Sequence, residues 1–230
     1  MCGRFALWRS KEALQAAFPD FEFPEEMPER YNIAPTDPVA VVPNDGERAV
    51  RFYRWGLVPG WSDGPSSRYT MINARSETAA EKPAFRAAYR HRRCLVLADG
   101  FYEWTKRAGE RRKTPMYVRL ASEAPMAFAG LWEVWHPKGQ ADAQPLYSCT
   151  ILTTDANDLI APVHPRMPVI LSPESYDRWL APGEARSDEL NPLLAPYSPE
   201  ELTMYEVSKT VNSPQNDGPG CIKPMPAAAD

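Results

Sequence analysis

The chain has 230 residues, of which 43% are hydrophobic and 24% charged, proportions that are ordinary for a globular protein. No apolar run approaches the roughly 18 residues that cross a membrane, and the N-terminus lacks the basic and apolar segments of a secretory signal. The net charge of −4 argues weakly against a protein that binds nucleic acid.

The first half of the chain is predicted to form short strands separated by short helices. Apolar and β-branched runs predict strands at residues 4–8, 38–43, 49–55, 70–73 and 93–98. Ser10 is suited to cap a helix that ends near residue 18. The turn Asn44-Asp45-Gly46 joins two of the strands into a hairpin. A helical stretch after residue 78 is interrupted at Pro83 and continues to about residue 90.

The second half follows the same pattern. Strands are predicted at residues 115–120, 126–135, 146–154, 169–171 and 201–207. Short helices are predicted from residue 155 to 160 and from Ser172 to 180. Strands and helices do not alternate as in βαβ units, so the sequence predicts an α+β fold. We expect a single domain with a mainly antiparallel, barrel-like sheet and short flanking helices.

Three segments are too rich in proline or glycine for regular structure, namely residues 19–35, 55–61 and 162–168. The second holds two tryptophans that either fill the core or form an exposed stacking surface. After Asn212 the chain is rich in proline, glycine and alanine. We therefore expect a folded domain over residues 2–212 and a disordered tail over residues 213–230.

Positive charge is concentrated in the middle of the chain. Between residues 68 and 119 there are ten Arg and three Lys against five acidic residues, a local balance of +8. Arginine suits bidentate phosphate contacts and stacking on bases, so this segment favours a nucleic-acid surface. The alternative is that these residues are scattered over solvated faces.

Four cysteines, Cys2, Cys94, Cys149 and Cys221, form no CxxC pair and no metal-ligand spacing. We expect reduced thiols in a cytoplasmic protein, with no metal ion and no cofactor. We also expect a monomer.

Cys2 is the residue with the most distinctive chemistry. We expect the initiator Met to be removed, because the side chain that follows it is small. The exposed α-amine has a reference pKa of about 7.7–8, so part of it is unprotonated at neutral pH. Such an amine attacks an aldehyde to give a Schiff base, and the adjacent thiol can then close a thiazolidine ring. The alternative is a small buried cysteine with no chemical role.

Two further residues are candidates for proton transfer. Glu103 lies between Tyr102 and Trp104, and apolar neighbours disfavour the charged form of a carboxylic acid. His164 lies in a loop with three prolines, which is a rigid support for an imidazole. The alternatives are an exposed strand residue and a structural histidine.

Six motifs occur in a fixed order along the chain. They are CGR at residues 2–4, YNIAP at 31–35, WGLVP at 55–59, NARSET at 73–78, DGFYEW at 99–104 and HPRMP at 164–168. Together they resemble the SRAP family, the SOS response-associated peptidase domain, and the resemblance covers residues 2 to about 212. Six motifs in register are far more specific than any one of them.

The resemblance implies that the protein senses abasic sites in single-stranded DNA and links to them covalently through Cys2. It implies that Asn73 orients the Cys2 amine or the sugar, that Glu103 moves protons and that His164 assists opening of the sugar ring. The resemblance also implies contacts between DNA and six other residues. Arg4, Arg75, Arg86 and Arg166 are expected to hold phosphates, whereas Trp61 and Trp104 are expected to stack on bases.

Two rival functions stay open at this point. Cys2, His164 and Asn73 have the residue types of a Cys-His-Asn hydrolase, so the protein could be a thiol peptidase or amidase that removes its own Met1. Alternatively, it could be a non-catalytic DNA-binding scaffold in which Cys2 is structural.

Overall fold

The computed structural model describes residues 2–66, 70–106, 109, 113–139 and 142–226. Met1 and part of the basic segment (Arg68, Arg107, Arg111 and Arg112) lie outside these residues. The strands are β1 (Phe5–Leu7), β2 (Arg30–Ile33), β3 (Pro38–Pro43), β4 (Arg51–Trp55), β5 (Asn73–Arg75), β6 (Arg93–Ala98), β7 (Gly100–Thr105), β8 (Thr114–Leu120), β9 (Met126–Trp135), β10 (Leu146–Asp155), β11 (Arg166–Pro168), β12 (Ile170–Leu171) and β13 (Leu202–Glu206).

The helices are short. The α-helices are α1 (Lys11–Ala17), α2 (Ser76–Ala79), α3 (Arg86–His91), α4 (Tyr176–Trp179) and α5 (Ser187–Leu190). Single 3-10 turns occur at η1 (Pro173–Ser175), η2 (Asn191–Leu193), η3 (Pro199–Glu201), η4 (Lys209–Asn212) and η5 (Pro219–Cys221). Ser10 caps α1 as predicted, since its hydroxyl accepts from the Ala13 N–H at 3.3 Å.

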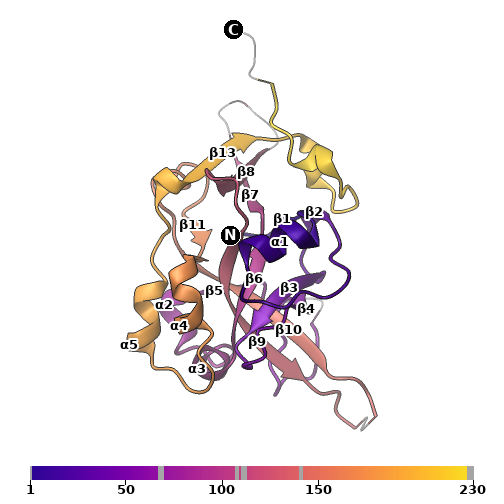
Figure 1. Ribbon diagram of the computed structural model, residues 1–230, viewed down its shortest axis with the longest axis vertical. Coiled ribbons are helices and arrows are strands. Elements are labelled where there is room, and N and C mark those ends of the chain that lie inside the picture. The colour runs from indigo at the N-terminus through magenta and orange to yellow at the C-terminus, as the bar shows by residue number, and fades with distance from the viewer. Residues whose placement is uncertain (1, 67–69, 107–108, 110–112, 140–141, 227–230) are drawn as a thin grey trace.

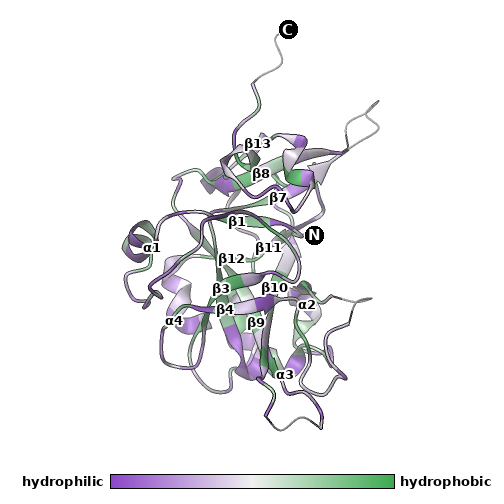
Figure 2. Cartoon of the chain, turned by 90° about the vertical axis from the view of Figure 1, so that its right-hand side faces the viewer, coloured by the Kyte–Doolittle hydropathy of each residue, from purple (hydrophilic) through white to green (hydrophobic). Residues whose placement is uncertain are grey.

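The strands form two sheets that lie one above the other (Figures 1 and 2). The upper sheet is antiparallel, with the strand order β13-β8-β7-β1-β2. In the lower sheet, each strand pairs with the next in the order β4-β3-β6-β9-β10. The last strand, β10, also pairs with the first, β4, and this closes a five-stranded barrel. The closing pair β4–β10 is parallel, as is the pair β5–β10.

Aromatic side chains join the two sheets into one core. Phe5 of β1 packs edge-on against Trp55 of β4 and Phe128 of β9, with ring centroids 5.0 and 5.9 Å apart. Phe101 of β7 also contacts Phe128. Beside the barrel, α3 and α4 pack together through the rings of Tyr89 and Trp179, whose centroids are 6.4 Å apart (Figure 1). The predicted fold class, a single α+β domain with a mainly antiparallel, barrel-like sheet, is therefore confirmed.

Several local predictions differ from the structure. The predicted irregular segment at residues 162–168 ends in β11, which pairs with β10. The predicted loop at residues 19–35 contains β2, which is held between β1 and residues of the C-terminal segment. The predicted strand at residues 70–73 is β5, which begins at Asn73. The predicted helix at residues 155–160 is a series of turns, because Asn157 caps the Ile160 N–H with its own side chain and Pro162 lacks an N–H to extend a helix.

The C-terminal segment also differs from the expected disordered tail. Residues 213–226 pack against the upper sheet, where Cys221 is buried and Tyr205 donates a hydrogen bond to Ile222 O at 3.1 Å. The composition of the segment did not reveal this packing, because most of the contacts that hold the segment are polar ones made by Asn216 and Asp217. Residues 227–230 lie outside the described residues.

Candidate active site around Cys2

Cys2 lies just before β1, between the upper sheet and the barrel. Its side chain is fully buried and belongs to the main hydrophobic core. Burial raises the pKa of the Cys2 thiol, and the negative charge of Glu103 raises it further. This environment therefore disfavours the thiolate.

Asn73 fixes the backbone of Cys2. Its Nδ2 donates to the Cys2 carbonyl oxygen at 2.7 Å. The position of Asn73 follows from the parallel pairing of β5 with β10, in which Asn73 lies opposite Ile151. The other side-chain atom, Asn73 Oδ1, is buried and has no hydrogen-bond partner among the described residues. A buried unsatisfied acceptor is costly, and such atoms mark sites that a ligand or water completes.

Glu103 is brought to Cys2 by the pairing of β1 with β7. Phe5 lies opposite Phe101, and the Tyr102 N–H donates to Arg4 O at 2.9 Å. Continuing this ladder places Gly3 opposite Glu103. Glu103 projects from the same face of β7 as Phe101, toward the barrel, and only 4% of it is exposed. An exposed strand position, the alternative considered for Glu103, is therefore wrong.

Arg4 and Trp104 lie beside each other on the opposite face of the upper sheet, where Trp104 packs with Tyr102 against a second, smaller hydrophobic cluster. The Arg4 guanidinium lies over the Trp104 ring at 5.9 Å from its centroid. Arg4 Nη1 donates to Asn32 Oδ1 at 2.7 Å and to Val211 O at 3.0 Å, while Arg4 Nε is buried without a partner among the described residues. Burial lowers the pKa of Arg4. The structure thus gathers Cys2, Asn73 and Glu103, and it pairs Arg4 with Trp104 on the other face of the sheet.

His164 lies two residues before β11, the short strand that pairs with the end of β10. Its Nδ1 is 3.0 Å from both the N–H and the carbonyl oxygen of Arg166. Nδ1 can therefore accept a hydrogen bond when it is unprotonated and donate one when it is protonated. This holds the ring orientation in either charge state, which suits a group that exchanges protons through Nε2.

Arg166 is engaged in ion pairs. Its guanidinium makes two hydrogen bonds with the Glu77 carboxylate, at 2.5 and 2.9 Å, and one with Asp155 Oδ1 at 2.7 Å. These contacts join β11 to α2 and to the end of β10. A phosphate at Arg166 would have to compete with two carboxylates.

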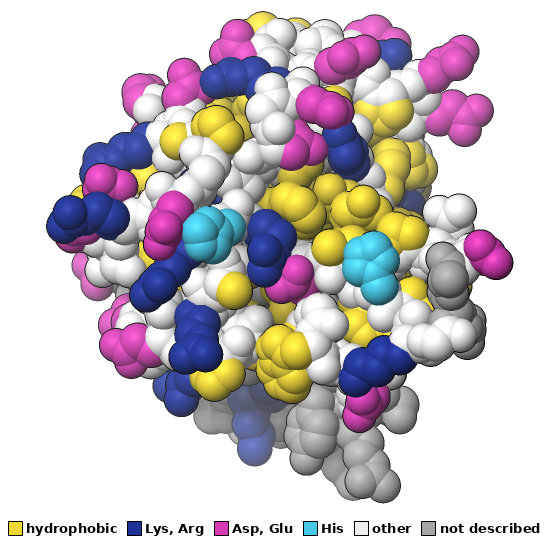
Figure 3. All heavy atoms as spheres, turned by 90° about the horizontal axis from the view of Figure 1, so that it is seen from below, with side chains coloured by type: hydrophobic (Ala, Val, Ile, Leu, Met, Phe, Trp, Pro, Cys, Tyr) yellow, Lys and Arg dark blue, Asp and Glu magenta, His cyan; other side chains and the backbone are white. Residues whose placement is uncertain are grey.

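The remaining predicted DNA-binding residues are exposed. Arg75 of β5 and Arg86 of α3 reach solvent. Of the two tryptophans in residues 55–61, Trp55 is buried in the core and Trp61 is 67% exposed. Trp61 borders a cavity of about 160 Å³ together with Met71, two residues before Asn73. Hydrophobic and basic side chains also adjoin on the lower face of the molecule (Figure 3).

The sequence analysis missed two residues next to this site. Asn32 is fully buried and contacts Arg4, and Asn212 Oδ1 accepts from Trp104 Nε1 at 2.7 Å. Asn32 lies in the YNIAP motif, and a polar residue within that motif was the only signal in the sequence. Among the described residues, no group of three or more His, Cys, Asp or Glu is arranged to hold a metal ion, and no helix is long and apolar enough to cross a membrane.

Comparisons with known proteins agree with these motifs. A family model described as SOS response associated peptidase (SRAP) matches residues 1–214. The abasic site processing protein YoqW of Bacillus subtilis is 43% identical over 227 residues, which cover 97% of this chain and 99% of the relative. The abasic site processing protein HMCES of Gallus gallus is 34% identical over 204 residues, 79% of this chain and 59% of the relative.

Solved structures with the same fold are also found. A protein from Bacteroides thetaiotaomicron gives a TM-score of 0.84 at 24% identity and covers 97% of this chain and 100% of its own. A protein from Bordetella bronchiseptica gives 0.77 at 28% identity, with 90% and 100% covered. The fold described above is therefore an established one.

Proposed function

Because the chain belongs to the SOS response-associated peptidase (SRAP) family, we propose that it processes abasic sites in DNA during the DNA damage response. The names of the relatives support this substrate. An abasic deoxyribose opens to an aldehyde, which is the electrophile that an N-terminal cysteine captures.

The reaction that fits the site is formation of a thiazolidine. Once Met1 has been removed, the Cys2 amine adds to the aldehyde carbon C1′, and the resulting carbinolamine loses water to give an imine. The Cys2 sulfur then adds to the imine carbon, and the thiol proton passes to the nitrogen. The sum is one aldehyde and one aminothiol giving one thiazolidine and one water. Burial of the Cys2 thiol disfavours the thiolate, which supports this order, with the amine acting first.

The single observation that carries the proposal is the environment of Cys2. Asn73 holds its carbonyl oxygen at 2.7 Å, and the charge of the buried Glu103 acts on its thiol. In the proposed mechanism Glu103 removes and returns protons as the carbinolamine dehydrates and the ring closes. Asn73 orients the amine by fixing the backbone that bears it, and its buried Oδ1 is available to the amine or the sugar. His164 assists ring opening by proton exchange at the sugar.

Single-stranded DNA is the proposed form of the substrate. Arg4, Arg75 and Arg86 would contact phosphates, and Arg166 would do so by exchanging one of its carboxylate partners. Trp61 and Trp104 would stack on bases that flank the abasic site. The exposure of Trp61 and the contact of Trp104 with the Arg4 guanidinium support these assignments.

A thiol hydrolase that uses Cys2 and His164 is the second candidate, since the family is named for a peptidase. In a Cys-His-Asn hydrolase the asparagine orients the histidine. Here the Asn73 amide donates to the Cys2 carbonyl, and the His164 ring is oriented by the backbone of Arg166. This arrangement favours the covalent capture of an aldehyde.

The test is a denaturing gel after incubation with single-stranded DNA that contains an abasic site. We expect a covalent shift that is absent in Cys2→Ala and in a variant with extra residues ahead of Cys2. Cys2→Ser should give only a reversible imine that borohydride traps, because a hydroxyl closes the ring poorly. A shift that survives an N-terminal extension would refute the role of the amine. Peptide cleavage without a shift would support the hydrolase, and salt-sensitive binding alone would support a scaffold.

A further inference from the structure

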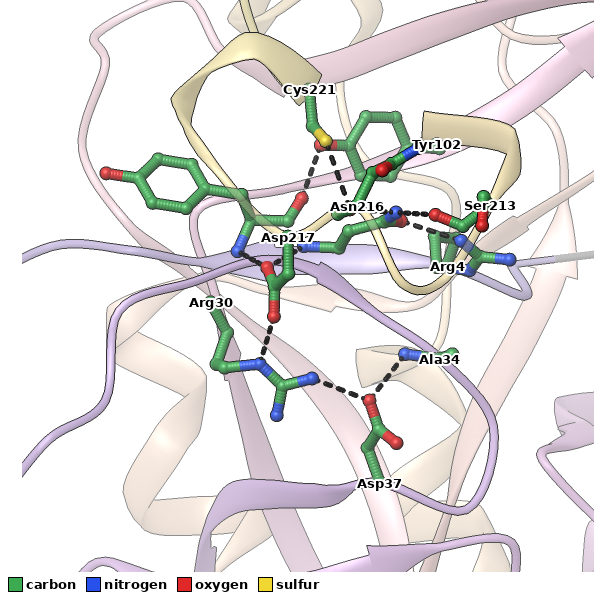
Figure 4. Close-up of polar contacts among 11 residues, drawn as sticks. Arg4, Arg30, Ala34, Asp37, Tyr102, Ser213, Asn216, Asp217 and Cys221 are labelled. Atoms are coloured by element: carbon green, nitrogen blue, oxygen red, sulfur yellow. Dashed lines mark hydrogen bonds and ion pairs between the residues drawn. The ribbon is translucent and has the colours of Figure 1, made fainter. Parts of the chain in front are cut away.

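Residues 208–222, which we call the clasp, lie against the upper sheet and contain η4 and η5 (Figure 4). The clasp is centred on the buried Asn32 of β2. Asn32 Nδ2 donates to three clasp carbonyls, those of Val211 at 3.1 Å, Ser213 at 3.0 Å and Asn216 at 2.6 Å. The Asn32 side-chain amide therefore holds the clasp backbone through direct hydrogen bonds.

Asp217 makes the reciprocal contacts from the clasp to β2. Its Oδ1 accepts from the N–H groups of Tyr31 and Asn32, at 2.5 and 2.9 Å, and its carboxylate pairs with Arg30. β2 is the last strand of the upper sheet, so these N–H groups lie on an edge that no strand covers. Asp217 thus satisfies donors that would otherwise need water, and it fixes the clasp along the edge.

The clasp also reaches Arg4 and Trp104, two of the residues proposed to contact DNA. Val211 O and the clasp-bound Asn32 both accept from Arg4 Nη1. Asn212 Oδ1 accepts from Trp104 Nε1 at 2.7 Å. The Arg4 guanidinium and the Trp104 ring, which lie against each other, are each held by the clasp or by Asn32.

We propose that the clasp positions Arg4 and Trp104 for the DNA strand, with Asn32 and Asn212 as the positioning residues. This proposal rests on the proposed function, and it extends to residues 215–222, beyond the part of the chain that the family model matches. The Arg4 side chain is held by neutral oxygens, so the clasp orients the cation without neutralising it. The positive charge is retained for a phosphate, and the indole is fixed in one plane for a base.

Asn212→Ala is the main test because Asn212 is exposed, so the variant should fold. The matched control is Gln215→Ala, an exposed residue of the same segment that makes no side-chain hydrogen bond with the described residues. Affinity is measured by fluorescence anisotropy with single-stranded DNA that carries a tetrahydrofuran abasic analogue. We expect Asn212→Ala to weaken binding about 3- to 10-fold, the range of one hydrogen bond, and Gln215→Ala to leave it unchanged.

A double-mutant cycle separates positioning from a general structural effect. If Asn212 acts through Trp104, the Asn212 substitution should have no further effect in a Trp104→Ala background. Asn32→Asp provides a second readout, since it places a carboxylate beside Arg4. It should lower the dependence of affinity on salt by about one phosphate contact.

Equal effects of Asn212→Ala in the wild-type and Trp104→Ala backgrounds would overturn the proposal, as would equal affinities for Asn212→Ala and Gln215→Ala. The proposed function fails differently, because wild-type protein would then give no Cys2-dependent covalent shift. The binding cycle is measured with an unreactive analogue, so its outcome does not depend on the covalent step.

Discussion

Glu103 is the carboxyl group that the fold brings to Cys2, and its substitution isolates proton transfer from binding. Glu103→Gln keeps the size of the side chain and removes the base. We expect crosslinking under single-turnover conditions at saturating DNA to slow by about 10²–10⁴-fold, while affinity for a tetrahydrofuran analogue stays nearly unchanged. Glu81→Gln, at an exposed position, is the matched control and should react normally.

His164→Ala is predicted to give the same kind of defect, because the fixed orientation of the ring matters only for the chemical step. Arg75→Ala is predicted to do the converse, with weaker binding and a nearly normal rate at saturation. A Glu103→Gln or His164→Ala variant whose whole defect lies in DNA affinity would contradict the prediction. These residues would then hold the strand instead of moving protons.

At the level of elements, β7 carries Glu103 and Trp104, and its position depends on Gly100. A Cβ at Gly100 would lie 2.5 Å from Val118 O and 2.6 Å from Tyr117 Oη, both on the paired strand β8. We expect Gly100→Ala to destabilise the protein by about 1–3 kcal/mol, the usual cost of overpacking, and to slow crosslinking because β7, which carries Glu103, is pushed away from β8.

Gly220→Ala is the control for this prediction, since a Cβ there meets no atom within 4 Å. Chemical denaturation gives the free energy of unfolding for both variants, and single-turnover crosslinking gives the rate. Equal stability of Gly100→Ala and wild type would show that β7 and β8 separate without cost.

The ion pair between Glu77 and Arg166 joins α2 to β11 and predicts a pH dependence of stability. The hydrogen bond from Arg166 lowers the pKa of Glu77 below its unfolded value of about 4.3. The stabilisation is therefore fully present above that value and is lost as the pH falls through the folded pKa. Glu77 is about half exposed, so the pair should contribute no more than about 0.2–1 kcal/mol.

The measurement compares the unfolding free energies of wild type and Glu77→Gln at several pH values between neutrality and pH 3. We expect wild type to be the more stable at neutral pH and the difference to vanish on acidification. A difference that stays constant over this range would show that Glu77 stabilises the protein through packing and not through its charge.

For the whole molecule, local sequence patterns predicted the strands whose burial depends on neighbouring residues. The features that the sequence did not predict depend on contacts between residues distant in sequence. Apolar and β-branched runs predicted β6 and β9, and such runs around an Asn-Asp-Gly turn predicted the β3–β4 hairpin, because a buried strand leaves a local apolar signal. Closure of the barrel by the parallel β4–β10 pair leaves no such signal. β2 and the ordered clasp were not predicted, because they are held by polar contacts between Asn32 and residues about 180 positions away.

In the candidate site, too, some features were predictable from the sequence and others were not. Cys2 and Glu103 were recognisable from chemistry and from the aromatic neighbours of Glu103, and the structure brings them together. For Arg166 the sequence showed only a cation near His164. Its pairing with Glu77 depends on the packing of α2 against the barrel, which periodicity does not reveal.

The charge of the whole molecule leads to the last prediction. The net charge is −4, so attraction to DNA must come from local cations and not from the overall field. Exposed aromatic rings and arginines suit unstacked bases, and therefore single-stranded DNA should bind more tightly than intact duplex, with affinity falling as salt rises. In anisotropy titrations over a series of salt concentrations, Arg75→Ala should lower the slope of log affinity against log salt by about one contact. Arg186→Ala should leave it unchanged, because this exposed arginine already pairs with Asp188. Equal affinity for duplex, or equal slopes for the two variants, would place the DNA on another face of the molecule.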